Sequence, residues 1–278
     1  MQFGDLQIDL LSDGTFKLDG GAMFGIVPKP LWTRERPADE RNRMLLSCNC
    51  PLIRWGKEIL LIDCGLGRKW NAKQREIYAI DPRPTLIDEL AALGLKPSDI
   101  TILLHTHLHL DHAGWNSQLN ANGELEPVFV NARHVVERRE LEVARTPNEI
   151  QRGTYLAENI APIDAQKSWD LFDDLREVIP GVSAFRTGGH TYGHCGVRID
   201  SGGQKALFIG EMMPTTAHRH LPWIMAYDLY PLETLEMKRA LFKEVLSANT
   251  LVLLNHDPAA LAVRLKLNGE KIETEKVY

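Results

Sequence analysis

The chain has 278 residues, and its 32 Lys and Arg against 37 Asp and Glu give a formal net charge of −5. Its 44% hydrophobic and 25% charged residues are typical of a globular protein that buries its own core. The acidic balance argues against nucleic acid as a partner, and we find neither a signal peptide nor a membrane-spanning run. We therefore expect a cytoplasmic protein that acts on a small molecule, folded as a single domain over residues 1–278.

The first half of the chain alternates strand-like and helix-like segments. Residues 19–43 are rich in apolar side chains but interrupted by Gly and Pro, which predicts a loop folded over a pocket. Thr85 to Leu93 predicts a helix, because its leucines share one face and a glycine follows. We expect strands over residues 6–11, 44–54, 58–62 and 100–104, the second and third joined by a hairpin turn.

The second half repeats this alternation, which predicts a layered α/β fold. Residues 131–143 and 231–246 read as helices, and the first of them would expose His134 on a charged face. Residues 146–168 lack a regular period, apart from a short helical turn near residue 157. We expect strands over residues 128–130, 182–186, 196–199, 206–209 and 250–254.

Four of the ten histidines lie within eight residues, directly after the predicted strand at 100–104. Even scattering would place about 0.3 histidines in such a window. His107 and His109 are two apart, so an extended backbone presents both to one cation. Asp111 and His112 follow at a turn and can face a second cation. His105 precedes the cluster on the strand, where we expect a buried core histidine.

The segment from His107 to His112 resembles the H-x-H-x-D-H motif of the metallo-β-lactamase superfamily. Residues 61–65 resemble an earlier motif of that family, a strand that ends in an Asp, and residues 189–194, 208–211 and 254–257 resemble later motifs in the family's order. The resemblance covers most of the chain, and it is greatest to the lactonase-like and organophosphate-hydrolase-like branch. It implies an αββα sandwich, in which two mixed β-sheets are flanked by helices.

The resemblance also implies a site with two divalent metal ions, for which zinc is the default and Fe, Mn or Co suit the same ligand types. One ion would be held by His107, His109 and His190, the other by Asp111, His112 and His256, with Glu211 as the bridge. Asp63 would support a ligand histidine and His194 would orient its loop. Glu211 stands where the family usually has Asp, and its extra methylene could widen the metal pair or weaken one of the two sites. Tyr192 stands where the family usually has Pro, which is a departure from the relatives' mechanism.

The function implied is hydrolysis of a small-molecule lactone or ester by a metal-bound hydroxide, with Asp111 passing a proton to the leaving group. Alternatives are a phosphotriester or thioester hydrolase, a mononuclear iron dioxygenase, and a non-catalytic metal-binding sensor. A homodimer is compatible with the apolar residues of 19–43. The substrate pocket is expected to be lined by Phe24, Trp32, Trp115, His218 and Trp223.

Overall fold

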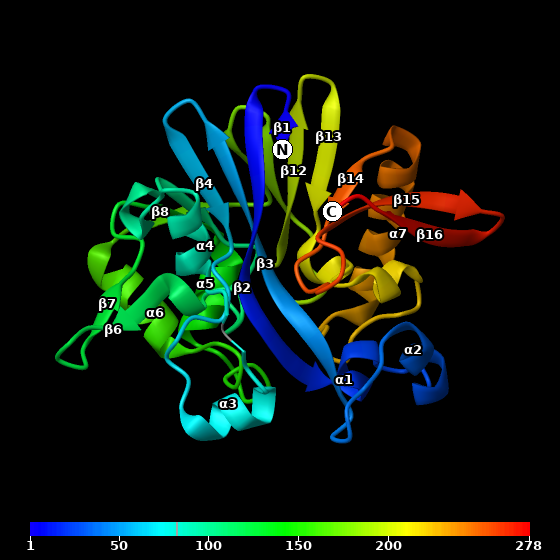
Figure 1. Cartoon of the computed structure of the whole chain (residues 1–278), viewed down its shortest axis with the longest axis horizontal. Coiled ribbons are helices and arrows are strands. Elements are labelled where there is room, and N and C mark those ends of the chain that lie inside the picture. The colour runs from blue at the N-terminus through cyan, green and yellow to red at the C-terminus, as the bar shows by residue number, and fades with distance from the viewer. Residues whose placement is uncertain (82) are drawn as a thin grey trace.

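The computed structural model describes residues 1–81 and 83–278. Within them, two seven-stranded mixed sheets pack face to face, with helices on their outer faces (Figure 1). The first sheet contains β1 (Gln2–Phe3), β2 (Leu6–Asp19), β3 (Arg43–Trp55), β4 (Glu58–Ile62), β5 (Ile102–Leu104), β8 (Arg133–Glu137) and β9 (Trp169–Phe172), in that order. The predicted αββα sandwich is confirmed.

The second sheet is built from the later part of the chain. Its strands, in order, are β10 (Leu175–Ile179), β11 (Val182–Arg186), β12 (Cys195–Ser201), β13 (Gln204–Phe208), β14 (Leu251–Leu253), β15 (Ala262–Asn268) and β16 (Lys271–Lys276). The pair β13–β14 is parallel, as are β4–β5, β5–β8 and β8–β9, while the other pairs are antiparallel. A two-stranded ribbon, β6 (Ser117–Leu119) and β7 (Leu125–Pro127), stands apart from both sheets.

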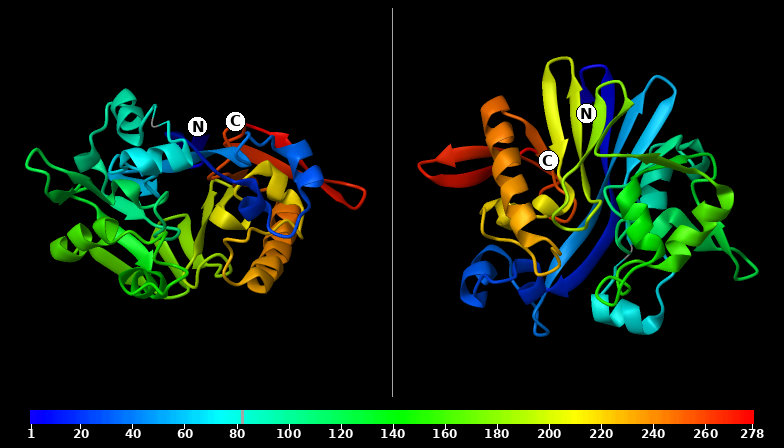
Figure 2. Two further views of the ribbon diagram at one scale, coloured as in Figure 1. Left: turned by 90° about the horizontal axis from the view of Figure 1, so that it is seen from below. Right: turned by 180° about the vertical axis from the view of Figure 1, so that it is seen from behind.

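The helices cover the outer faces of the sheets and one end of the sandwich (Figure 2). They are α1 (Gly20–Phe24), α2 (Lys29–Glu35), α3 (Ala72–Tyr78), α4 (Leu86–Ala92), α5 (Arg138–Arg145), α6 (Ala157–Gln166) and α7 (Pro231–Ala248). Helix α4 begins at Thr85, whose side chain accepts from the Asp88 N–H in a capping box. Helix α7 starts with a proline and ends at Asn249 in the left-handed conformation.

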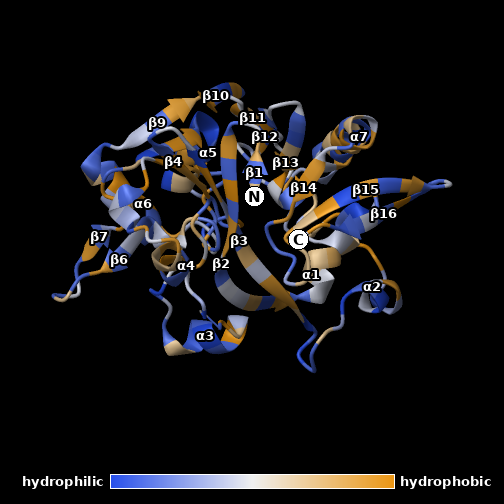
Figure 3. Ribbon diagram, turned by 45° about the horizontal axis from the view of Figure 1, so that its top comes forward, coloured by the Kyte–Doolittle hydropathy of each residue, from blue (hydrophilic) through white to orange (hydrophobic). Residues whose placement is uncertain are grey.

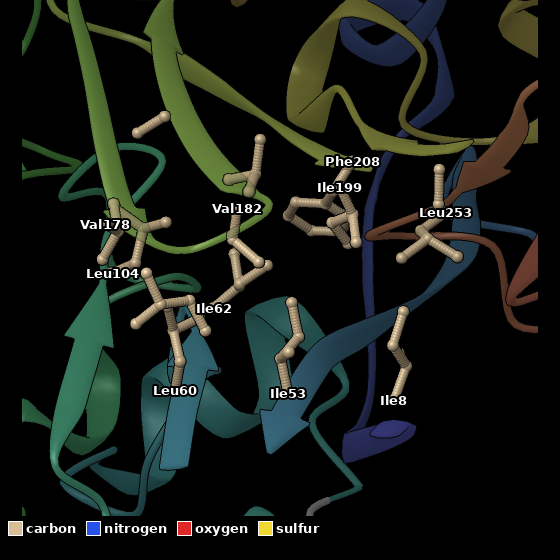
Figure 4. Close-up of a cluster of buried hydrophobic side chains, with 14 of the residues drawn as sticks. Ile8, Ile53, Leu60, Ile62, Leu104, Val178, Val182, Ile199, Phe208 and Leu253 are labelled. Atoms are coloured by element: carbon tan, nitrogen blue, oxygen red, sulfur yellow. The ribbon is translucent and has the colours of Figure 1, made fainter. Parts of the chain in front are cut away.

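The core lies between the two sheets. Apolar and polar residues follow one another along β2 and β3 (Figure 3). The start of β2 alternates between buried and exposed positions, whereas residues 46–53 of β3 are buried on both faces of the strand. Side chains of the two sheets point toward one another in Figure 4, where Ile53 and Leu60 of the first sheet approach Val182, Ile199 and Phe208 of the second. Burying such side chains stabilises each by roughly 1.5–3 kcal/mol relative to leaving it exposed. This packing fixes the strand ends that carry the site.

Several local predictions are wrong. Residues 133–137 form strand β8 rather than helix, and His134 is buried at 0% exposure, contacting His105 at 3.3 Å between ring nitrogens. The strand predicted at 128–130 is a turn. Residues 19–43 include two short helices and the end of β2 instead of a loop alone, whereas the helical turn expected at residues 155–160 is found as the start of the longer helix α6. Burial between β5 and β9 overrides the charged composition of β8, because both strands pair with it.

Candidate metal centre

The predicted ligands lie at the ends of strands from both sheets. The motif from His107 to His112 follows β5, Glu211 follows β13 and His256 follows β14. His190 lies in the loop between β11 and β12. Strands β4, β5, β13 and β14 form parallel pairs, so their carboxyl ends meet at the same edge of the sandwich. A rigid scaffold therefore presents these side chains on short loops.

One group of ligand atoms comes from His107, His109 and His190, which all lie within 4.8 Å of one another. The Nε2 atom of His190 is 3.1 Å from Nδ1 of His109. The Nε2 atom of His107 is buried and has no hydrogen-bond partner in the described part of the chain. Three converging imidazole nitrogens, one of them without a partner, fit a bound cation, since a buried unpaired nitrogen is otherwise costly.

A second group consists of Asp111, His112 and His256, and it meets the same distance criterion. The two histidine Nε2 atoms are 3.2 Å apart. Oε1 of Glu211 lies 2.9 Å from Nε2 of His256 and 3.3 Å from Nε2 of His112. Glu211 also forms a group with His107 and His112, so its carboxylate lies between the two clusters.

The ring nitrogens that face away from the centre are occupied by acceptors of the protein. Nδ1 of His112 lies 2.9 Å from the Asp63 carboxylate, and Nδ1 of His190 lies 2.8 Å from the Asp228 carboxylate. Nδ1 of His256 lies 2.7 Å from the carbonyl oxygen of Ser47. Such contacts fix the ring orientation and leave Nε2 as the ligand atom.

Asp63 connects two strand ends. It adopts a left-handed backbone conformation, with φ 55°, directly after β4. Its carboxylate also accepts hydrogen bonds from the Thr106 N–H at 2.8 Å and the Thr106 hydroxyl at 2.7 Å. Asp63 therefore holds His112 and the start of the histidine motif at once, which is the support expected from the sequence.

His194 and Asn255 surround Glu211. Nε2 of His194 accepts the Glu211 backbone N–H at 3.2 Å, while its Nδ1 contacts the Thr187 hydroxyl at 2.5 Å. The Asn255 amide donates to Oε1 of Glu211. The Glu211 side chain, which is one methylene longer than the Asp usual in the family, is thus held by Asn255, the residue before His256.

Sequence reasoning missed Glu140, a carboxylate of α5 buried beside the motif. It accepts from the Leu108 N–H at 2.9 Å and the Tyr155 hydroxyl at 2.8 Å. The Thr191 hydroxyl donates to its other oxygen at 2.6 Å, so Glu140 ties the two histidine loops together. Burial raises the pKa of its carboxyl group. Gly193 permits this contact, because a Cβ there would lie 2.4 Å from the Glu140 nitrogen.

Burial also sets the charge of two histidines of the first cluster, His107 and His109. It is the main reason why the pKa values of His107 and His109 lie well below their ordinary value, and neighbouring histidines lower them further. Both rings are therefore neutral near pH 7. Neutral imidazole is the form that binds a metal ion.

The seven predicted ligand residues line one side of a cavity of about 200 Å³, which we call its floor. Its walls come from β2, the end of α3, the 146–156 segment and the 225–229 loop. Beyond the seven ligands, the lining residues are Phe16, Leu18, Met23, Tyr78, Leu110, Ile150, Gln151, Thr154, Met225, Ala226, Tyr227 and Leu229. The cavity is mainly apolar, as expected for a small-molecule site.

The five predicted pocket residues are not among these lining residues, which corrects the sequence-based expectation. Phe24 stacks on Trp32 and on His218, with ring centroids 5.1 Å and 4.8 Å apart, and meets Trp223 edge-on. Phe24, Trp32 and Trp223 belong to a core cluster that also contains lining residues of the cavity, such as Met23 and Met225. Trp115 lies elsewhere and donates to Asp13 at 2.8 Å. Their apolar composition predicted that these side chains are buried, but it did not predict whether they line the cavity.

Comparison with known proteins agrees with this geometry. A family model described as the metallo-beta-lactamase superfamily matches residues 43–256. A solved structure of a probable metal-dependent hydrolase from Staphylococcus aureus is 34% identical, covers 100% of both chains and has a TM-score of 0.91. The chain therefore belongs to the metallo-β-lactamase superfamily, as the sequence motifs predicted.

Two lactonases are also similar to the chain. An N-acyl homoserine lactonase of Bacillus sp is 32% identical over 116 residues, which are 42% of this chain and 39% of that protein. The match thus spans about two fifths of the length of this curated relative. AidC, a dizinc quorum-quenching lactonase solved with a product, is 16% identical with a TM-score of 0.82, covering 100% of this chain and 96% of that one. At this identity, the second likeness concerns the fold.

No helix in the described ranges 1–81 and 83–278 is both long and apolar enough to cross a membrane.

Proposed function

We propose that this protein is a metal-dependent hydrolase that opens a lactone or ester bond in a small molecule. The observation that carries the proposal is the convergence of five histidines and two carboxylates on the floor of an apolar cavity. Membership of the metallo-β-lactamase superfamily and similarity to a protein named N-acyl homoserine lactonase support it. A lactone is the preferred substrate because this relative acts on one.

Two divalent cations fit the residues present, and zinc suits their imidazole and carboxylate donors. His107, His109 and His190 would hold one ion, while Asp111, His112 and His256 would hold the other, with Glu211 shared between them. The support is chemical: the His107 nitrogen has no protein partner in the described chain, and the outer nitrogens of three other rings are already occupied. Bound divalent cations supply Lewis acidity and lower the pKa of a coordinated water toward neutrality.

The protein side chains then position the substrate and move the proton. Oδ2 of Asp111 lies 3.6 Å from Nε2 of His256 and 3.8 Å from Nε2 of His112, and Asp111 lines the cavity. From there Asp111 takes up the proton that the attacking water gives up on adding to the carbonyl carbon, and passes it to the alkoxide oxygen that leaves as the acyl C–O bond breaks. Met23, Met225 and Leu229 hold the non-reacting part of the substrate and keep water out of the cavity.

The first test measures metal content per chain on freshly purified protein, together with hydrolysis of γ-lactones and aryl esters. We expect about two metal ions per chain and turnover that a chelator abolishes and added zinc restores. Asp111→Asn should lower turnover by at least about 100-fold, because it removes the proton carrier. Asp200→Asn, on an exposed residue, is the matched control and should behave as wild type.

The outcomes separate the alternatives. Wild-type turnover in Asp111→Asn, after contaminating activity is excluded, would contradict the mechanism. One tightly held iron without hydrolysis would favour a mononuclear dioxygenase. Two metals without any turnover would favour a sensor, and turnover confined to phosphotriesters or thioesters would change the bond that is broken.

A further inference from the structure

Tyr192 lies in the loop between β11 and β12, two residues after His190, and its side chain is 45% exposed. Two guanidinium groups lie over its ring, with Cζ of Arg186 at 5.0 Å and Cζ of Arg139 at 5.9 Å from the ring centroid. A cation within about 6 Å of an aromatic face is attracted to it, more strongly where water is excluded. The two arginine side chains are mostly buried, at 19% and 28% exposed. The ring therefore binds cations from two different elements of the fold.

Carboxylates fix both arginines. Arg186 ends β11, and its Nη2 atom lies 3.2 Å from Oε1 of Glu233 in the first turn of α7. Arg139 belongs to α5, and its Nη1 atom donates to Oδ1 of Asp174 at 2.7 Å. The Nε–H of Arg186 also donates to the Tyr192 carbonyl oxygen at 2.7 Å. Both the ring and the backbone of Tyr192 are thus tied to side chains that the fold holds in place.

The loop that contains this ring carries two groups of the metal centre. His190 is a predicted ligand, and Nε2 of His194 accepts the Glu211 backbone N–H at 3.2 Å. On the inner side of the loop, the Thr191 hydroxyl donates to the buried Glu140 carboxylate at 2.6 Å. The contacts to the arginines restrain the same loop on its exposed side. A shift of this loop would therefore move one ligand and the support of the shared carboxylate together.

The loop needs such restraint because its first part contains two consecutive glycines. Gly188 and Gly189 have φ angles of 60° and 81°, in the region that favours glycine. Glycine has more backbone freedom to lose than other residues, so ordering this loop costs more entropy. Where a loop samples several conformations, the apparent affinity for a ligand falls with the fraction that can bind. The proline usual in the family restricts its own φ, whereas Tyr192 leaves that restraint to its contacts.

We propose that Tyr192 is a positioning residue, which keeps the 187–194 loop in the conformation that places His190 and His194 at the metal centre. Arg186 and Arg139 are the groups through which its ring and carbonyl oxygen are held. Tyr192 does not belong to the described lining of the cavity, so it acts through the loop rather than through the substrate. The inference rests on the metal site of the proposed function, and zinc binding tests it without turnover.

Competition with a chromophoric chelator measures the zinc affinity of Tyr192→Ala. We expect a fall of about threefold to tenfold, because two cation–π contacts are lost and the loop spends less time in the binding conformation. In the zinc-free protein, hydrogen exchange of the amides in residues 187–194 should be faster by a similar factor. Tyr192→Phe keeps the ring and its contacts, so its zinc affinity should stay within about twofold of wild type.

Arginine variants test whether the ring acts through its cations. Arg186→Met keeps an apolar stem but removes the charge, so it should lower zinc affinity as Tyr192→Ala does. The double variant should lose less than the product of the two single losses, because both substitutions remove one shared contact. Arg198→Met is the matched control and should bind zinc as wild type does. Arg198 lies 3.7 Å over the Phe185 ring and pairs with Glu244, but it belongs to β12 outside the loop.

The outcomes separate positioning from general stability and from the proposed function. Zinc affinity and exchange rates within twofold of wild type in Tyr192→Ala would overturn the proposal, as would losses that simply multiply in the double variant. A broad loss of structure in zinc-free Tyr192→Ala, seen by circular dichroism, would assign the ring a general structural role and would also overturn it. If wild type binds zinc but opens no lactone or ester, the proposed function fails, while the zinc titrations still decide whether Tyr192 positions the loop.

Discussion

Two carboxylates, those of Asp63 and Asp228, each accept a hydrogen bond from the Nδ1 side of a different histidine of the site. Asp63 accepts from the His112 side and Asp228 from the His190 side, at 2.9 Å and 2.8 Å. Asp63 lies in a segment that resembles a family motif, so the sequence predicted its role. Asp228 lies in an irregular loop without a motif, and only the folded chain places it beside His190.

Asp228→Asn tests this support at the scale of one residue. An amide keeps the size and one acceptor oxygen but loses the negative charge that polarises the imidazole, so zinc affinity should fall about 10- to 100-fold. Competition with a chromophoric chelator measures that affinity. Asp200→Asn is again the control, and zinc affinity within twofold of wild type in Asp228→Asn would show that the contact does not tune the site.

At the scale of elements, α5 connects the two histidine loops through one buried carboxylate. Glu140 accepts from the motif backbone at Leu108 and from Thr191 next to His190. A charged helix would ordinarily be read as solvent-facing, yet Glu140 is 0% exposed. The reason is that the loops bring three donors to it, and a buried carboxylate persists only where donors surround it.

Glu140→Gln should destabilise the protein by about 1–3 kcal/mol, because the amide group presents hydrogens to donors that then lack an acceptor. Urea unfolding monitored by circular dichroism gives the free energy of unfolding. Glu142→Gln, on an exposed residue of the same helix, should leave that free energy within about 0.5 kcal/mol of wild type. Equal stability of the two variants would show that Glu140 does not hold the loops.

At the scale of the whole molecule, Asp13 joins segments that are distant in the chain. Its carboxylate accepts from the Leu86 N–H at the start of α4, from the Gly67 N–H and from the Trp115 indole, at 2.7 to 2.9 Å. Burial nevertheless outweighs these donors and raises its pKa from 3.8 to about 6. Folding is therefore linked to a proton at this position.

The sign of this linkage follows from the direction of the shift. Between about pH 4 and pH 6 the native state keeps the Asp13 proton, whereas the unfolded chain has lost it. The stability contributed by Asp13 is fully present below pH 4 and is lost as the pH rises through about 6, by about 3 kcal/mol. The free energy of unfolding of wild type minus that of Asp13→Asn should fall by this amount. A difference that does not vary with pH would contradict the shift.

Short local patterns in the sequence predicted the layered fold, the superfamily and the candidate ligands, because strand ends and metal donors each have a recognisable local spacing. Both the hairpin near Gly56 and the helix that begins at Thr85 were read from such patterns. Local composition failed at His134, where a charged segment pairs between two buried strands. There the neighbouring strands, not the segment itself, decide the conformation.

Local patterns did not predict which side chains face the cavity or which acceptors contact the predicted ligands. Phe24 and Met23 are neighbours in one apolar stretch and belong to the same core cluster, yet only Met23 is also a lining residue of the cavity. Asp228, Glu140 and Tyr227 reach the site from elements without motifs. Hydrophobicity predicts that a side chain is buried, but the direction it faces depends on contacts between residues far apart in the chain, which no local pattern encodes.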